Sequence, residues 1–462
     1  MHEHTLELVT TLIIPDWMEL RTCASSRDSP LNYIDIIDGD DYDGSEVVDK
    51  LRVAKQHPEL RKLVLSEIDM DQNVLAALAD LLRAERKWEA IHLSHCGGEL
   101  EKAVEMLSRG NVCKLLEVAG NVDALCMDSL AQGLKANNSL KELSLFVNLD
   151  ASNVGSLVDG LAYNTTVEKL MLTKSALKPD CIKTLAAFLQ ADQQLKSLHL
   201  DNCFIEDEDL AELVNALQNH CTLKELRLVG TFDKPDATFA ICSLLQQNRL
   251  ENLCVHRRRH LAEGKKLDTS WLVPALTMNS SLTALDLSEN NLDNHVLEQL
   301  SEALSVNSTL EEIRLHGNHI TNQGVQSFAS RIGEMKGLKK LYLQRNQLDE
   351  IGANYLLEGI HGNDVIQEVT ISTTGRNKRM SKIQRMINYH TCLNSGGRYL
   401  LGDLQLPVSL WPLVFERSGA RPWPQYCDCQ NKSLDKWKRI QQADVIFHLL
   451  RGSALSTRGL NV

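Results

Sequence analysis

The sequence predicts an α/β solenoid, a coil of repeated strand–helix units with one parallel sheet on its concave side and helices on its convex side. Three observations predict it. A pattern of leucines recurs about every 28 residues, each copy holds a short alternating stretch typical of a strand, and apolar residues at helical spacing follow. One unit alone cannot bury both apolar faces, whereas stacked units can, so the repeats are expected to form one continuous array.

The repeated pattern is Leu-x-x-Leu-x-Leu-x-x-Asn. Clear copies open at Leu140, Leu282, Leu310 and Leu338. Weaker copies open at Leu60, Trp88, Cys113, Val167, Leu195, Leu223, Leu250 and Ile366, after an eroded first copy at Leu31. From Leu60 onward the steps are 25 to 28 residues, apart from one step of 32 after Leu250. We therefore expect a parallel sheet of twelve or thirteen short strands.

One unit shows how each element is expected to form. Residues 285–287 alternate as Leu-Asp-Leu, which favours a strand with both leucines on its buried face. Asp293 or Asn294 can cap the following helix. The apolar stripe of that helix consists of Leu297, Leu300 and Leu304. The segment Asn307-Ser308-Thr309 is expected to turn the chain back toward the next strand.

The asparagine that ends each pattern has a predicted structural duty. Its side chain can hydrogen-bond backbone groups of the turn that a sheet ladder leaves unpaired. Cys96, Cys203 and Thr231 hold this place in other units. We therefore interpret Cys96 and Cys203 as structural rather than as metal or redox residues.

These motifs resemble the ribonuclease-inhibitor-like class of leucine-rich repeats, which includes ribonuclease inhibitor, the Ran GTPase-activating protein and the sensor arrays of NOD-like receptors. The resemblance covers residues 31–372 and implies a leucine-rich-repeat horseshoe. It leaves residues 1–30 as an N-terminal cap and residues 373–462 as a C-terminal segment. The tail motifs at 393–398 and 410–414 also resemble tails on uncharacterised microalgal repeat proteins.

The C-terminal segment lacks the 28-residue period but is rich in aromatic residues. They include Tyr389, Tyr399, Trp411, Phe415, Trp423, Trp437 and Phe447. Disordered tails lack such apolar surface, and a solenoid exposes the apolar edge of its final repeat unless something covers it. We expect residues 373–462 to form a helical cap against the repeat that opens at Ile366.

Charge and cysteine usage favour an intracellular setting. The net charge is −12, yet residues 376–462 carry 14 Lys and Arg against 5 Asp and Glu. The first 20 residues hold no Lys or Arg, so no secretory signal is expected there, and no apolar run is long enough to span a bilayer. The twelve cysteines are scattered, which favours free thiols in a reducing compartment. The cytoplasm is the expected location, with the nucleus as the alternative.

No motif indicates catalysis, a cofactor or a metal. The acidic run at 38–44 has Gly39 where an EF-hand needs a ligand and Lys50 where it needs glutamate. Cys427 and Cys429 have the wrong spacing for a zinc knuckle. Phosphate-binding loops and nucleophile elbows are absent from the sequence. The glycosylation-type sequons at Asn137, Asn164, Asn279, Asn307 and Asn431 are interpreted as turn chemistry, since four fall between a helix and the next strand.

Alternation along the strands predicts which side chains face the hollow of the arc. These are His92, Phe146, Met171, His199, Arg227, Cys254, His256, Asp286, Arg314, His316, Tyr342 and Gln344. An irregular basic loop follows His256 and contains Arg257, Arg258 and Arg259. Aromatic and arginine side chains are the usual anchors of interfaces. The predicted partner-binding residues are Phe146, Met171, His199, Arg227, His256, Arg257, Arg258, Arg259, Arg314 and Tyr342. The alternatives are an ordinary solvated sheet surface and an irregular solvated loop.

The sequence thus favours an intracellular scaffold, not an enzyme, that binds another protein through the concave face and the basic loop. An acidic partner suits the loop, whereas neither a membrane nor a nucleic acid is favoured. One alternative, from the family resemblance, is a GTPase-activating protein, although Ran activators carry an acidic tail and this tail is basic. Another is a ubiquitin-ligase substrate receptor, although 30 residues before the first repeat are too few for a usual F-box.

Overall fold

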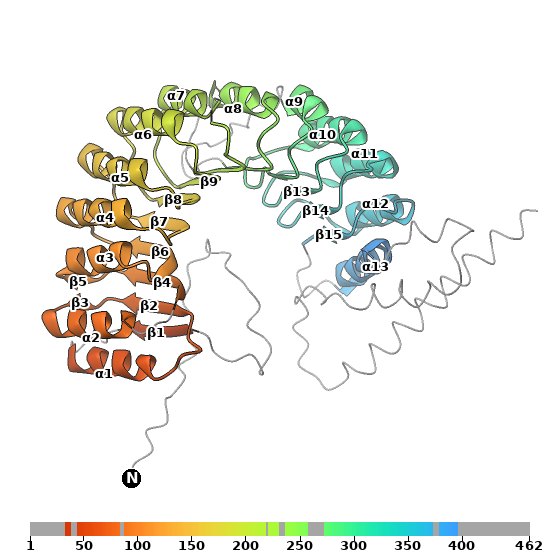
Figure 1. Ribbon diagram of the computed structural model, residues 1–462. Helices are drawn as coiled ribbons and strands as arrows, with labels where there is room; N and C mark the ends of the chain where they lie inside the picture. The colour runs from red at the N-terminus through yellow and green to blue at the C-terminus, as the bar shows by residue number, and fades with distance from the viewer. Residues whose placement is uncertain are drawn as a thin grey trace, which may run out of the picture.

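The chain forms an arc with strands on the inside and helices on the outside (Figure 1). The computed structural model describes residues 33–37, 44–83, 87–218, 220–230, 236–256, 272–372 and 378–395. Within these residues, thirteen strands form one sheet in which neighbouring strands belong to successive repeats and run parallel. The predicted leucine-rich-repeat solenoid is therefore confirmed.

The strands of the main sheet are short, as the brief alternation in each repeat predicts. They are β1 (Tyr33–Ile37), β2 (Lys62–Ser66), β4 (Trp88–Ser94), β6 (Cys113–Ala119), β7 (Glu142–Phe146), β8 (Lys169–Thr173), β9 (Ser197–Asp201), β10 (Glu225–Val229), β11 (Asn252–His256), β12 (Ala284–Asp286), β13 (Glu312–Arg314), β14 (Lys340–Tyr342) and β15 (Glu368–Thr370). A second, two-stranded sheet of β3 (Asp69–Met70) and β5 (Gly97–Gly98) was not predicted from the sequence.

One helix follows each strand of the main sheet and returns the chain to the next repeat. The helices are α1 (Gly44–Lys55), α2 (Gln72–Leu82), α3 (Leu100–Arg109), α4 (Ala124–Ala136), α5 (Ala151–Tyr163), α6 (Pro179–Ala191), α7 (Asp207–Leu217), α8 (Asp236–Gln246), α9 (Leu272–Met278), α10 (Asn294–Val306), α11 (Asn322–Arg331) with the 3-10 turn η1 (Ile332–Glu334), α12 (Glu350–His361) and α13 (Lys378–Ser395). None of the described helices is long and apolar enough to cross a lipid bilayer.

Aspartates begin several helices by accepting hydrogen bonds from free backbone N–H groups. The residues that do so are Asp71, Asp123, Asp150, Asp293 and Asp349. Of the two predicted caps for α10, Asp293 holds the cap position and Asn294 opens the helix.

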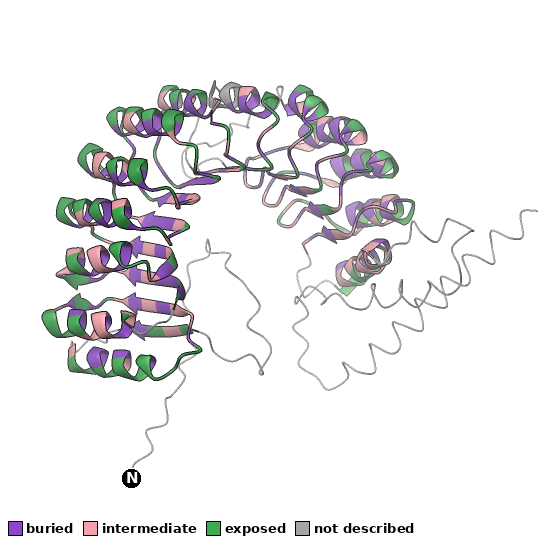
Figure 2. Cartoon of the chain, in the orientation of Figure 1, coloured by how far each residue is buried: buried purple, intermediate pink, exposed green. Residues whose placement is uncertain are grey.

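The core lies between the sheet and the helices, where the buried faces of both meet (Figure 2). Leu285 and Leu287 are 1 % and 0 % exposed, and the predicted helical stripe of Leu297, Leu300 and Leu304 is buried against this side of the sheet. Burial of aliphatic side chains in every repeat is the main force that holds the array together.

Hydrogen bonds at the end of the leucine pattern tie successive repeats together. Asn318 Nδ2 donates to the Leu287 carbonyl at 3.1 Å, and its Oδ1 accepts from the Asn290 amide at 3.0 Å. Cys96 and Cys203 take the same place, because each Sγ donates to a carbonyl of the preceding repeat at 3.3 Å. Their predicted structural role is confirmed.

Asn148 does not perform the duty predicted for it. Its side chain is exposed, whereas Val147 and Leu149 on either side are buried. The turn after β7 therefore buries the apolar side chains of Val147 and Leu149. The turns after β12 and β13 bury the amide side chains of Asn290 and Asn318 instead.

A second series of asparagines binds the turns between helices and strands. The side chains of Asn137, Asn164, Asn279 and Asn307, which belong to four of the sequons, are buried and hydrogen-bonded to the backbone. Asn307, for example, donates to the Leu276 carbonyl at 2.7 Å and accepts from the Leu310 amide at 2.8 Å. These four sequons are turn chemistry, as predicted, and Asn431 lies outside the described residues.

Helix α13 packs against α12 and β15 and so covers the last strand of the sheet (Figure 1). Its Met380, Ile383 and Ile387 are buried there. Other expectations fall outside the described residues: the N-terminal cap at 1–30, the acidic run at 38–43, the loop at 257–271 and the tail at 396–462.

Candidate partner-binding surface

Parallel pairing without slippage brings one side chain from every repeat into a single line across the concave face. We call this line the central row. It consists of Asp35, Val64, His92, Glu117, Ser144, Met171, His199, Arg227, Cys254, Asp286, Arg314, Tyr342 and Thr370. The residues on either side of each member point toward the helices, so the row faces the hollow of the arc.

The structure brings most of the predicted binding residues together on this face. Met171, His199, Arg227, Arg314 and Tyr342 lie in the central row. Phe146 and His256 lie two positions further along their own strands, on the same face. Arg257, Arg258 and Arg259 lie outside the described residues, so the loop remains a prediction.

The middle of the face carries an uncharged patch. Ser144 and Met171 are paired in register on β7 and β8, and Phe146 lies two residues beyond Ser144. Met171 and Phe146 are both half-buried. A sulfur side chain and an aromatic ring on adjacent strands offer apolar area to a partner.

Beyond this patch, His199 is held by acidic and hydroxyl side chains. Its Nε2 lies 3.1 Å from Glu225 Oε1, and Ser197 Oγ donates to Glu225 Oε2 at 2.7 Å. The hydrogen bond from His199 outweighs the opposing effect of burial and lowers the pKa of Glu225 to about 2. Only 7 % of the His199 side chain is exposed, so this residue supports the surface more than it offers itself to a partner.

The arginines of the face are fixed by neighbouring carboxylates. Arg227 Nε lies 3.1 Å from Asp201 Oδ1, and Arg314 Nε lies 2.7 Å from Glu312 Oε1. The guanidinium of Arg314 also lies 5.5 Å from the centre of the Tyr342 ring. These contacts hold the side chains in one conformation before any partner arrives, which lowers the entropic cost of binding.

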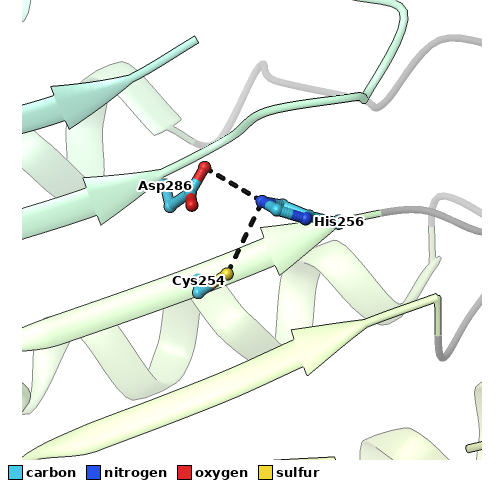
Figure 3. A group of neighbouring side chains, drawn as sticks. All are labelled: Cys254, His256 and Asp286. Carbon is cyan, nitrogen blue, oxygen red and sulfur yellow. Dashed lines mark hydrogen bonds and ion pairs between the residues drawn. The ribbon is translucent and has the colours of Figure 1, made fainter. Parts of the chain in front are cut away.

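Cys254, His256 and Asp286 converge between β11 and β12 (Figure 3). His256 Nε2 lies 2.9 Å from Asp286 Oδ1 and 3.6 Å from Cys254 Sγ. Burial raises the pKa of the Cys254 thiol well above its usual value. Burial opposes ionisation of Asp286 too, but the hydrogen bond and charge of His256 hold the pKa of that carboxyl well below its ordinary range.

Sequence reasoning missed the acids that organise this face. Glu117, Asp201, Glu225 and Glu312 pair with His92, Arg227, His199 and Arg314 respectively. The signal for Glu117 was available, because Glu117 stands one repeat after His92 at the same place in the pattern. The convergence of Cys254 with Asp286 could have been found in the same way, since the two are in register.

Comparisons with known proteins give limited likenesses. No protein family model matches the sequence, and no curated protein sequence matches it either. A structure of Rad7 and Elc1 in complex from yeast is similar at 15 % identity over 71 % of this chain and 76 % of that chain, with a TM-score of 0.47. The leiomodin-1 actin-binding site 2 is similar at 13 % identity over 36 % of this chain and 95 % of that chain, with a TM-score of 0.30. The tropomodulin C-terminal domain of Caenorhabditis elegans is similar at 10 % identity over 47 % of this chain and 98 % of that chain, with a TM-score of 0.23.

Proposed function

We propose that this protein is an interaction scaffold that binds another protein against the concave face of its solenoid. The observation that carries the proposal is the central row. It places Met171, His199, Arg227, Arg314 and Tyr342 on one continuous surface drawn from seven repeats, with the arginines already fixed by Asp201 and Glu312. Extended concave surfaces of this kind are what solenoids offer to macromolecules.

The uncharged patch of Phe146 and Met171 is proposed as the apolar anchor, with the paired arginines further along the sheet, on β10 and β13, as the polar rim. Apolar side chains at the centre of an interface account for most of the binding free energy, while charged rims set rate and specificity. The basic loop at 257–259 extends this rim in the proposal and favours a partner with an acidic surface.

We further propose membership of the ribonuclease-inhibitor class, a cytoplasmic location and no catalytic activity of the chain's own. The alternation of one strand and one helix per repeat supports the first. The GTPase-activating and ubiquitin-ligase readings remain the alternatives. The identity of the captured partner distinguishes these functions. A GTPase-activating protein would recover a small GTPase, a ubiquitin-ligase receptor would recover ligase subunits, and a scaffold would recover an unrelated acidic protein.

The test is capture of partners from the cell of origin by the full chain and by a Met171→Glu variant, followed by mass spectrometry. Met171 is half-buried on β8, so a glutamate there places a charge at the proposed anchor without entering the core. We expect the specific partners to be lost. Met278→Glu is the matched control, since Met278 is 76 % exposed on the convex helix α9. Retention of every partner by Met171→Glu would contradict the proposal.

A further inference from the structure

A group of potential metal ligands lies on the concave face, apart from the anchor proposed above. Within the described part of the chain, Cys254, His256 and Asp286 form a group whose ligand atoms all lie within 4.8 Å of one another. Two come from β11 and one from β12, the neighbouring strand (Figure 3). The sequence predicted no metal site, because the ligands are separated by an irregular repeat and match no known spacing.

The distances suit a tetrahedral zinc ion. Typical Zn–S and Zn–N bonds of about 2.3 Å and 2.0 Å at a tetrahedral angle require sulfur and nitrogen to be about 3.5 Å apart. Cys254 Sγ and His256 Nε2 are 3.6 Å apart. By the same bond lengths, nitrogen and oxygen should be about 3.3 Å apart. His256 Nε2 and Asp286 Oδ1 are 2.9 Å apart, so a small outward movement of the carboxylate would admit the ion.

The backbone already orients the aspartate. The Ser288 amide donates to Asp286 Oδ1 at 3.0 Å, a bond of the kind that fixes metal-binding carboxylates. All three ligand residues are held on regular strands or at their ends, with 11 % and 12 % of the His256 and Asp286 side chains exposed. Rigid, partly buried ligands lose little entropy when they bind an ion.

Charge at this site also suits a divalent cation. A thiolate from Cys254 and the carboxylate of Asp286 together supply two negative charges, and binding releases the thiol proton to solvent. The arginines on the flanking strands lie close enough to interact electrostatically with Cys254 and Asp286, but their ion pairs are with other acids, Arg227 with Asp201 and Arg314 with Glu312.

Two other histidine–acid pairs on this face lack the thiol that approaches the pair of His256 and Asp286. His92 Nδ1 lies 3.3 Å from Glu117, and His199 Nε2 lies 3.1 Å from Glu225. Neither pair belongs to a metal-ligand group of the described residues, whereas a thiol approaches the same nitrogen of His256 that contacts Asp286. Nitrogen, sulfur and oxygen donors of this kind are the usual ligands of Zn²⁺.

We propose that Cys254, His256 and Asp286 bind one Zn²⁺ ion on the concave face, with water in the fourth position. Three protein ligands and one exchangeable position are typical of zinc sites that act on, or exchange, an external ligand. The fourth position opens toward the hollow of the arc, because the central row faces it. The site does not depend on the proposed partner and can be tested without one.

The test uses the purified full chain, stripped of metal by a chelator and titrated with Co²⁺ as a spectroscopic substitute for Zn²⁺. We expect a thiolate-to-cobalt charge-transfer absorption and tetrahedral cobalt bands at one equivalent, both displaced by Zn²⁺. Loss of an outer-shell partner typically costs about 10- to 100-fold in metal affinity, so loss of a ligand should cost at least about 100-fold. Cys254→Ser should abolish the charge-transfer absorption, and Asp286→Asn should weaken binding.

Two matched controls share the chemistry but not the site. His199→Gln removes the histidine of another histidine–acid pair on the concave face, and Cys392→Ser removes a partly buried cysteine on α13. Both should bind Co²⁺ as the unaltered chain does. A second measurement needs no variant. Bound Zn²⁺ should protect the Cys254 thiol from an alkylating reagent, and mass spectrometry measures the alkylated fraction.

Two outcomes would overturn the proposal. One is a full chain that shows no thiolate–cobalt absorption and no protection of Cys254. The other is a folded Cys254→Ser variant that keeps the absorption and affinity of the original.

Discussion

Asn394 Nδ2 donates to the main-chain carbonyl of Asn363 at 2.9 Å, and Asn307 Nδ2 makes the same bond to the carbonyl of Asn279 at 3.0 Å. Asn394 also donates to the Ile366 carbonyl at 2.8 Å. Helix α13 therefore continues the column of helices and repeats the amide-to-carbonyl hydrogen bonds of their turns, although no leucine pattern marks residues 378–395 as a repeat.

This relationship predicts that α13 protects the end of the array. A chain that ends after Ser395 keeps α13 and serves as the reference. A chain that ends at residue 372 should melt at a lower temperature, because the edge covered by Met380, Ile383 and Ile387 becomes exposed. Circular dichroism melting of the two truncated chains measures the difference. Equal melting temperatures would mean that α13 adds nothing to the array.

Among the asparagines that end the leucine pattern, the buried Asn318 and the exposed Asn148 should differ in their effect on stability. Asn318→Ala removes the side-chain hydrogen bonds to three buried backbone groups of the preceding repeat, at an expected cost of about 1–3 kcal/mol per group left unsatisfied. Asn148→Ala alters an exposed side chain and should change the free energy of unfolding by less than about 0.5 kcal/mol. Denaturant unfolding measures the free energy of unfolding of both variants. A large loss in Asn148→Ala would show that its exposed amide has a role after all.

Leu285→Asp should be severely destabilising, by several kcal/mol, because it places an unpaired charge among buried side chains. Leu125→Asp is the control, since Leu125 is 66 % exposed on α4. Thermal melting compares the two. An unchanged midpoint for Leu285→Asp would contradict the assignment of this leucine to the core.

Glu225 should contribute stability that acid removes. Its pKa in the folded chain, about 2, lies below the ordinary value of 4.5, so the contribution is present above pH 4.5 and is lost as the pH falls toward 2. The stability advantage of the unaltered chain over Glu225→Gln should therefore shrink across this window. Denaturant unfolding at several pH values measures it. Glu298→Gln alters an exposed acid on α10 and serves as the control. An advantage that is constant with pH would show that the His199 contact does not favour the charged form.

Reversal of Arg257, Arg258 and Arg259 to Glu should slow association with an acidic partner without altering folding, because charges at the rim of an interface act mainly on rate. Binding kinetics at two salt concentrations measure this effect. Reversal of three exposed arginines on the convex side, Arg52, Arg83 and Arg109, is the control. A rate that responds neither to the loop reversal nor to salt would remove the loop from the binding surface.

The sequence by itself determined the solenoid. The leucine period specifies which residues are buried, and parallel stacking of equal units leaves one way to bury them, so the sheet, the helices and the concave positions all follow from it. The roles of Cys96, Cys203 and the turn asparagines followed too, because they are local to the repeat.

Only the tertiary structure decided what depends on distance between side chains of different repeats. It showed that Asn148 is exposed, that α13 joins the helix column through Asn394, and that Asp201 and Glu225 fix Arg227 and His199. It also brought Asp286 to Cys254 and His256 across a repeat of irregular length. Periodicity fixes which face a side chain occupies, but contacts across strands depend on the register and on rotamers, which the period does not encode.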